Sequence, residues 1–449
     1  MNSILVFLVV LVVLLLIGAP VATSFGLSSI VYILMQSVPL SIVAQRMISS
    51  VDSLTIMCVP LFILAGELMG AGGIAKRLVR VINLIFGNVT GGLALVTVVV
   101  CAFFAALTGS AMACSVAIGS IMLPYMLDAG YDRRFSAAII ASAACLGPII
   151  PPSTSLIVYG ATAQVSIAKL YQAGLPSGLI IGAALVLVAL WGCRRHGYKG
   201  LPKTYGLNEL KGFEHIQPGD RLTGRQILRI VVDAIPAIIA PVIILGSMFC
   251  GIATPTESAV VAVVYSFIVG VFVYREYEIR DVIKVLRKTC KGTSTVLWIM
   301  CCAGLFSWVL TYSKIPDKVV ASLAPVAETM GSWVVMLLVI VIVLIMGCFM
   351  GTSPIILIVV PLFQSLFVKL GYDMVHWGTV ISIACCIGMI TPPFGVALYA
   401  ATSVSGCELK EVVKRSLPFT ASCIVVLFIV TYFAEVVLFV PKLLGYSIF

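Results

Sequence analysis

The sequence carries the same arrangement of glycines and prolines twice. In each half, a Gly-Tyr-Asp triplet is followed by a single glycine and then by a Pro-Pro pair at the same spacing. These positions are Gly130-Tyr131-Asp132, Gly147 and Pro151-Pro152 in the first half, and Gly371-Tyr372-Asp373, Gly388 and Pro392-Pro393 in the second. Two further matching segments, Thr108-Gly109-Ser110 and Met350-Gly351-Thr352, lie upstream of them. Paired Gly and Pro interruptions in corresponding apolar segments indicate a membrane protein built from two structural repeats.

The composition places both repeats in a membrane. Of the 449 residues, 61% are hydrophobic and only 10% are charged, too few charges for a soluble protein of this length. The net charge of +10 is expected to reflect basic cytoplasmic loops rather than nucleic-acid binding. The 14 cysteines lie mostly inside apolar runs without a CxxC motif, so neither disulfides nor a thiolate metal site is expected. The first apolar run, 4–17, lacks a basic flank and is interpreted as a retained span, not a signal peptide.

Apolar runs of spanning length predict five membrane crossings in each half. They cover 3–23, 27–45, 54–70, 136–160 and 172–193, and then 230–250, 254–274, 293–312, 378–402 and 417–440. Each half also contains a longer run, 92–127 or 332–368, with a Gly-Ser or Gly-Thr break near its middle. Split there, each arm has about 17 residues and a length of about 25 Å, less than the hydrocarbon core of about 30 Å. We therefore predict two re-entrant helical hairpins whose tips end near the midplane.

The predicted fold is an all-α polytopic membrane protein with two inverted-topology repeats, each with a re-entrant hairpin and a broken transmembrane helix. The expected organisation is scaffold helices and an amphipathic arm over 1–91, the first hairpin and broken helix over 92–171, a closing helix over 172–193, a cytoplasmic linker over 194–229, scaffold helices and an arm over 230–331, the second hairpin and broken helix over 332–416, and a C-terminal helix over 417–449.

The distribution of charge predicts that the repeats are inverted. The linker carries a set of basic residues that should keep it in the cytoplasm: Arg194, Arg195, Lys199, Lys203, Lys211, Arg221, Arg225 and Arg229. Counting crossings from it places Arg133-Arg134 inside, the matching Val375-His376 outside, and the basic segment 410–415 inside again. Both termini then lie outside. Arg46 is the exception, because the crossing at 27–45 leaves it on the wrong side.

Several other features have a structural interpretation. Amphipathic stretches before each hairpin, 74–86 and 316–330, suit helices lying in the membrane interface, although connecting loops are an alternative. The segment Thr254-Pro255-Thr256-Glu257 has the pattern of a capped helix start rather than an ion site. Glu67 and Asp233 are expected at the interface. The three histidines, His196, His215 and His376, are predicted to lie in loops without metal-ligand spacing.

The chemistry at the breaks favours a cation. Two prolines in series remove donors and unwind a helix, and the freed carbonyls in apolar surroundings need partners. Simple kinks are the alternative, but four breaks in two equivalent pairs argue against it. The polar residues there are hydroxyls: Thr108, Ser110, Thr352 and Ser353 at the tips, and Ser153, Thr154, Ser155 and Thr391 in the broken helices. Neither core segment carries a carboxylate or histidine for proton coupling, so Na⁺ is the predicted ion.

These motifs resemble those of a known family. The segments 61–69, 108–111, 130–132, 149–153, 253–257 and 391–393 are similar to the large (M) membrane subunit of tripartite ATP-independent periplasmic (TRAP) transporters. The resemblance implies a multi-pass protein of the bacterial inner membrane with an elevator mechanism, in which a transport domain carries an organic acid with Na⁺ past a scaffold. It also implies two partners, a small four-helix Q membrane subunit and a periplasmic substrate-binding protein, and no organic cofactor.

The resemblance also implies site residues. One sodium site would use Thr108, Ser110, Gly147, Ile150 and Pro152, mostly through carbonyls, and the repeat suggests a second at Met350, Thr352, Gly388, Thr391 and Pro393. The organic anion is expected near Gly109, Ser110, Ser153, Thr154, Gly351 and Ser353. The stretch 113–115 has no acid where some relatives carry one.

Three other functions are alternatives to this one. A two-component elevator-type carboxylate carrier or exchanger, without a binding protein, is the closest alternative. An intramembrane enzyme would need paired aspartates, a Ser–Lys pair or a histidine-rich metal site inside the spans, and none is present in the sequence. A channel would need a continuous polar path, whereas the breaks form two separate half-sites.

Overall fold

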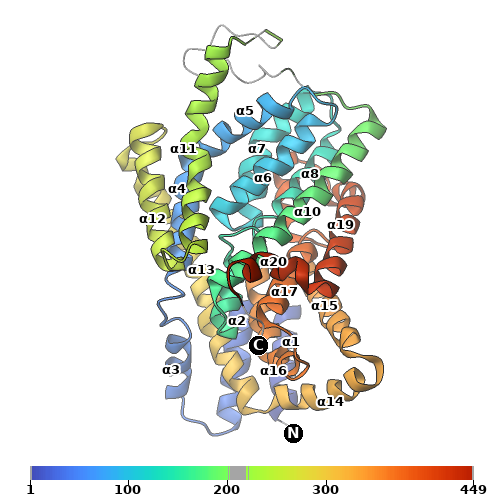
Figure 1. Cartoon of the computed structure of the whole chain (residues 1–449). Coiled ribbons are helices and arrows are strands. Elements are labelled where there is room, and N and C mark those ends of the chain that lie inside the picture. Colours follow the sequence, from blue (N-terminus) through green and yellow to red (C-terminus); the bar gives the residue numbers. More distant parts are fainter. Residues whose placement is uncertain (1–2, 201, 203–218, 221, 447–449) are drawn as a thin grey trace.

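A computed structural model describes residues 3–200, 202, 219–220 and 222–446 (Figure 1). All regular secondary structure in these ranges is helical, and eight of the helices are long and apolar enough to cross a membrane. The predicted all-helical, multi-pass class is therefore confirmed. The linker residues Lys203, Lys211 and Arg221, together with His215, lie outside the described residues.

Within the described residues, each half of the chain contains ten α-helices, and in both halves an amphipathic helix, a hairpin and a broken helix follow one another in that order. The first half contains α1 (Ser3–Leu16), α2 (Val21–Met35), α3 (Ser41–Ser49), α4 (Cys58–Ala71), α5 (Ile74–Phe86), α6 (Gly92–Thr108), α7 (Ala111–Asp128), α8 (Arg133–Ala144), α9 (Thr154–Ala163) and α10 (Ile167–His196). The second contains α11 (Gly224–Phe249), α12 (Pro255–Ile268, continued by a π-helical turn over Val269–Val273), α13 (Ile279–Tyr312), α14 (Ile315–Met330), α15 (Ser332–Phe349), α16 (Thr352–Lys369), α17 (Met374–Gly388), α18 (Val396–Ser405), α19 (Leu409–Tyr432) and α20 (Ala434–Leu443).

The helices form two bundles that lie side by side. A peripheral bundle contains α1–α4 and α11–α13, in which α4 packs on α12 and α2 on α13. A core bundle contains the hairpins, the broken helices and the long helices α10 and α19. The bundles touch where α13 meets α16 and where α4 meets α6. In Figure 1 the hairpin α6–α7 occupies the upper half of the core bundle, and α15–α16 occupies the lower half.

The first two predicted crossings are shorter than the sequence indicated. The predicted spans 3–23 and 27–45 are α1, with 14 residues, and α2, with 15, or about 22 Å of helix each. Gln36 donates a hydrogen bond to the Ser3 hydroxyl at 2.7 Å, so the outer ends of α1 and α2 are tied together. Residues 41–49 form the separate helix α3, which removes the conflict over Arg46 because this residue no longer ends a crossing.

Two helical hairpins are present with their turns at the predicted positions, and their re-entrant placement stays a prediction. Helices α6 and α7 are separated only by Gly109-Ser110, and α15 and α16 only by Met350-Gly351. Their arms contain 17 or 18 residues. Three of these arms, α7, α15 and α16, meet the length and hydropathy expected of a spanning helix.

The Gly-Tyr-Asp triplets form the turns that connect each hairpin to the following broken helix. Gly130 and Gly371 adopt φ values of +78° and +75°, a left-handed conformation that glycine tolerates without steric cost. The following aspartates cap the next helices, since Asp132 accepts from Arg134 N–H and Asp373 from the N–H groups of Val375 and His376. Tyr446 near the C-terminus donates to Asp373 at 2.8 Å, and burial, with this bond, raises the pKa of Tyr446 to about 12.

The amphipathic stretches are confirmed as helices. They are α5, which lies at 64° to α4, and α14, which begins one residue earlier than predicted (Figure 1). Helix α5 is buried between α6 and α11 along most of its length. Its Arg77 side chain, only 10% exposed, pairs with Asp233 at 3.1 Å and with Glu276 at 2.8 Å. These two ion pairs therefore connect α5, the amphipathic helix of the first repeat, to the second repeat.

The remaining structural predictions have mixed outcomes. The capped start of α12 is confirmed, because Thr254 N–H donates to the Glu257 carboxylate at 2.7 Å and Glu257 N–H to the Thr254 hydroxyl at 3.3 Å. Glu67 pairs with Lys288 at 2.7 Å.

The placement of the histidines in loops is wrong for two of them. His376 is 2% exposed in the first turn of α17, where Nε2 lies 2.8 Å from the Val430 carbonyl, and His196 is the last residue of α10.

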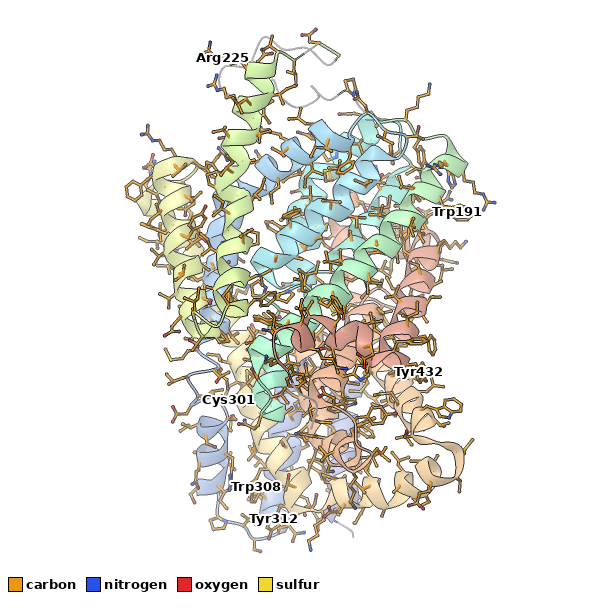
Figure 2. All side chains as sticks on the ribbon, in the orientation of Figure 1. Trp191, Arg225, Cys301, Trp308, Tyr312 and Tyr432 are labelled. Atoms are coloured by element: carbon orange, nitrogen blue, oxygen red, sulfur yellow. The ribbon has the colours of Figure 1, made fainter. Side chains whose placement is uncertain are left out.

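Aromatic side chains mark the two ends of the bundle. Trp308 and Tyr312 stack near the lower end of α13, and Trp191 projects from the upper part of α10 (Figure 2). Such positions are typical of interface anchors.

Candidate functional site

The first hairpin tip lies directly against the break between α8 and α9. Gly109 has φ +60°, and a Cβ atom added to it would lie 2.6 Å from the Pro152 carbonyl oxygen. The Thr154 hydroxyl donates to the Gly109 carbonyl at 3.1 Å, which ties the start of α9 to the tip. A Cβ on Gly147 would likewise lie 2.9 Å from the Ser110 carbonyl oxygen. Tip and break thus touch backbone to backbone.

The break between α8 and α9 leaves carbonyl groups without partners. Helical structure is absent over 145–153, so the interpretation as a simple kink is wrong. Six carbonyl oxygens in this buried segment accept no hydrogen bond from the described residues: those of Cys145, Gly147, Ile149, Ile150, Pro151 and Pro152. Buried carbonyl groups without a partner are uncommon. Their oxygens have the chemistry that a hard monovalent cation requires, so the residues present fit Na⁺.

The hydroxyls of the first break have local partners. Ser153 and Ser155 both donate to the Pro148 carbonyl, the latter at 2.8 Å, and Ser153 also caps the N–H of Leu156. Thr108 donates to the carbonyl of Phe104 in its own helix at 3.1 Å. These three side chains therefore shape the break and its tip, and the backbone carbonyls are the groups left for an ion.

The second half-site, formed by the hairpin α15–α16 and the break between α17 and α18, has its hairpin and break in contact at a different point. Gly395 N–H donates to the Cys348 carbonyl at 3.1 Å, and a Cβ on Gly388 would lie 2.6 Å from the Cα of Gly347. Gly351, in contrast, has φ −73° and open space where a Cβ would be. A close approach of the tip glycine to the break is therefore present at Gly109 and absent at Gly351. In the second repeat Gly347, inside α15, takes that role.

The two half-sites also differ in exposure. Residues 147–153 of the first break are buried, whereas Pro393 and Phe394 of the second are exposed, Phe394 by 58%. The carbonyl oxygens of Thr391, Pro392 and Pro393 accept no hydrogen bond within the described ranges. The Thr391 hydroxyl donates to the Ile387 carbonyl at 2.7 Å. Met350 and Gly351 border a cavity of about 690 Å³ together with Trp298 of the peripheral bundle.

The half-sites are interlocked. Helix α9, which follows the first break, packs on the second hairpin at α16 and on α17. Helix α18, which follows the second break, packs on α7 of the first hairpin and on α8. The long helices support the breaks from behind: Gly174 of α10 lies under Ile149, and Thr420 of α19 donates to the Ile390 carbonyl at 3.1 Å. Both half-sites thus belong to one packed unit.

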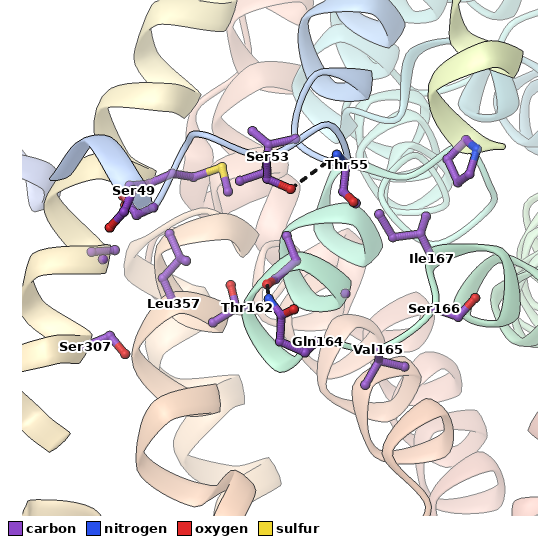
Figure 3. A pocket seen from close by; sticks show the side chains of 18 of the residues that line it. Ser49, Ser53, Thr55, Thr162, Gln164, Val165, Ser166, Ile167, Ser307 and Leu357 are labelled. Atoms are coloured by element: carbon purple, nitrogen blue, oxygen red, sulfur yellow. Dashed lines mark hydrogen bonds between the residues drawn. The ribbon is translucent and has the colours of Figure 1, made fainter. Parts of the chain in front are cut away.

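A polar cavity of about 540 Å³ lies at the seam between the two bundles (Figure 3). Ser49, Ser53 and Thr55 face it from the peripheral side, and Thr162, Gln164 and Ser166 from the core side. Among the residues that the structure describes, none with a charged side chain lines it. Within the described part of the chain, the hydroxyls of Thr55, Ser166 and Ser307 donate no hydrogen bond. No sequence motif indicates this cavity, because its walls come from segments far apart in the chain.

The predicted site residues are only partly brought together. Gly109, Ser110, Gly147, Pro152 and Thr154 meet in the first half-site. Thr352 begins α16 and is buried, whereas Gly351 borders the cavity beside Trp298. None of the six predicted substrate residues lines the seam cavity.

Comparison with known proteins identifies relatives along nearly the whole chain. Residues 8–436 match the family model described as tripartite ATP-independent periplasmic transporter, DctM component. The chain is 36% identical over 426 residues to the isethionate TRAP transporter permease protein DctMQ of Oleidesulfovibrio alaskensis, covering 95% of this chain and 64% of that relative. It is also 36% identical to the C4-dicarboxylate TRAP transporter large permease protein of Pseudomonas aeruginosa, with 94% and 95% covered. The sialic acid TRAP transporter large permease protein of Vibrio cholerae is 29% identical, with 96% of each covered.

Two solved transporters share the fold at low identity. The YdaH transporter of Alcanivorax borkumensis superimposes with a TM-score of 0.59 at 12% identity, covering 88% of this chain and 89% of that one. MtrF of Neisseria gonorrhoeae gives a TM-score of 0.58 at 13% identity, covering 87% and 83%.

Proposed function

Because this chain belongs to the DctM family of tripartite ATP-independent periplasmic transporter components, we propose that it imports a small organic anion together with Na⁺. The family is one of transport proteins rather than enzymes, as the sequence predicted. The observation that carries the sodium part of the proposal is the set of buried carbonyl oxygens without partners in the α8–α9 break. One ion would lie among Ser110, Gly147, Ile150 and Pro152 near Thr108, and a second among Met350, Thr352, Gly388, Thr391 and Pro393.

The anion is proposed to bind between the half-sites, near Gly109, Ser110, Ser153, Thr154, Gly351 and Ser353. Relatives named for isethionate, C4-dicarboxylates, sialic acid and 2,3-diketo-L-gulonate support the class of small organic acids. Positive charge from bound Na⁺ would attract the acid group, since the half-sites themselves offer hydroxyl and backbone groups rather than cationic side chains.

Movement is proposed to follow an elevator mechanism, with the core bundle sliding against the peripheral bundle. The interlocked packing of α9 on α16 and of α18 on α7 supports a rigid moving unit, because neither half-site can shift without the other. The hairpins in opposite halves of the core bundle support inverted repeats and re-entrant tips (Figure 1). The protein would lie in the bacterial inner membrane and act with a small Q subunit and a periplasmic binding protein.

The test is reconstitution of the chain with its small subunit in proteoliposomes, with candidate binding proteins and a panel of organic acids. Uptake of one acid is expected only when its binding protein is present in the outer solution. Uptake at the same rate without any binding protein would favour the two-component carrier or exchanger instead.

The inverted arrangement predicts opposite accessibility for the two ends of the core bundle. His376 is buried, so the exposed Lys369 is the better reporter for the side opposite Arg134. In a background without native cysteines, Lys369→Cys should react with an impermeant thiol reagent on spheroplasts. Arg134→Cys should react only after the membrane is permeabilised. Labelling of both positions from the same side would rule out inverted repeats.

A further inference from the structure

A basic groove lies between the upper ends of α10 and α19, away from both half-sites and from the seam cavity. It has a volume of about 290 Å³. Arg195 and His196 line it from α10, and Lys414 and Arg415 line it from α19. This end of the bundle also carries the basic linker, which places it on the cytoplasmic side by charge.

The positive charge of the groove is only partly neutralised. Arg415 lies 3.5 Å from the Asp132 carboxylate and donates to His196 Nε2 at 3.2 Å. His196 Nδ1 lies 2.8 Å from the Gly192 carbonyl. Among the described residues Arg195 and Lys414 have no carboxylate partner, and the Arg195 guanidinium lies 5.5 Å from the Trp191 ring. Three cations therefore face one carboxylate.

Below these cations the groove becomes apolar on both helices. Trp191 and Val188 lie about one and two turns deeper than Arg195 on α10, and Pro418 and Phe419 lie one turn deeper than Lys414 and Arg415 on α19. Trp191 is 56% exposed at the outer edge of the bundle (Figure 2). Charge at the surface and an apolar wall beneath it match the two parts of a lipid at the membrane interface.

We propose that this groove binds an anionic phospholipid. The lipid phosphate would lie among Arg195, Lys414 and Arg415, and an acyl chain would run along Val188, Trp191 and Pro418. A soluble phosphate would pair with the cations equally well, but it would make no contact with the apolar side chains below them. The lipid would join α10 to α19, the helices that support the two breaks, at the ends farthest from the second hairpin.

Two double variants of the purified protein, one inside the groove and one outside it, can be compared for lipid binding. The double variant Arg195→Ala/Lys414→Ala removes two groove cations, and Arg194→Ala/Lys410→Ala removes two exposed cations from the same helices outside the groove. Native mass spectrometry would measure retained phosphatidylglycerol against phosphatidylcholine. The groove variant should bind phosphatidylglycerol about 25-fold more weakly, at about fivefold per cation, and the control should bind like the parent.

The charge-retaining variant Arg195→Lys/Lys414→Arg keeps the test informative if the alanine variant does not fold, and it should retain the lipid. Equal losses in the groove and control variants would overturn the proposal, because they would show attraction by diffuse surface charge. Displacement of phosphatidylglycerol by inorganic phosphate, or equal retention of phosphatidylcholine, would also overturn it.

Discussion

Substitution of Gly109 by valine is expected to reduce uptake by about 100-fold, since displacement of a site by about 1 Å can cost that much. Gly109 holds φ +60°, and its added Cβ would lie 2.6 Å from the Pro152 carbonyl oxygen. A branched residue is strained in that conformation, and its side chain would push the hairpin tip away from the break. The backbone contact between the tip and the segment from Gly147 to Pro152 would then be lost.

The second tip supplies the control. Gly351 has φ −73° and nothing near the position of a Cβ, so Gly351→Val should fold without displacing its tip. It should reduce uptake less than Gly109→Val, because its side chain can crowd only the bound anion. Both variants would be compared in proteoliposomes after their amounts and monodispersity are matched. Normal uptake by Gly109→Val would show that the first tip is not part of the site. Equal loss in both variants would contradict the asymmetry of the two half-sites.

Removal of sodium is expected to bring uptake to background, and collapse of the pH gradient should leave it unchanged. The ion sites proposed here consist of carbonyl oxygens, which do not titrate, and sodium would be the only source of positive charge beside the substrate. Radiolabelled acid uptake would be measured with an inward Na⁺ gradient, with choline in its place, and with a protonophore present. Uptake driven by a proton gradient in choline buffer would refute sodium coupling.

Local features of the fold could be predicted from the sequence. The Gly109-Ser110 and Met350-Gly351 turns, the two proline breaks and the α5 arm are each specified by a few neighbouring residues. Glycine, proline and amphipathic spacing restrict the backbone wherever they occur, so their effect does not depend on the rest of the chain.

Contacts between distant segments could not be predicted in the same way. Gly347 lies inside an uninterrupted apolar run, and only its packing against Gly388 reveals why a glycine is there. A glycine within a helical pattern was the one available signal. His376 looked like a loop residue, although the capping aspartate at 373 could have placed it in the first turn of α17. The seam cavity depends on how two bundles meet, which no single segment encodes.

The interlocked packing of the half-sites has a consequence for how the protein is made. When α9 leaves the ribosome, α16 and α17, against which it will pack, have not yet been translated. Helix α9 must therefore wait in the bilayer until the second half is inserted, with the face that packs on α16 and α17 uncovered, a period in which an insertase or chaperone would protect it. Neither repeat can mature alone. Truncation after the linker should leave a product for membrane proteases to degrade, and co-expression of the two halves should restore it.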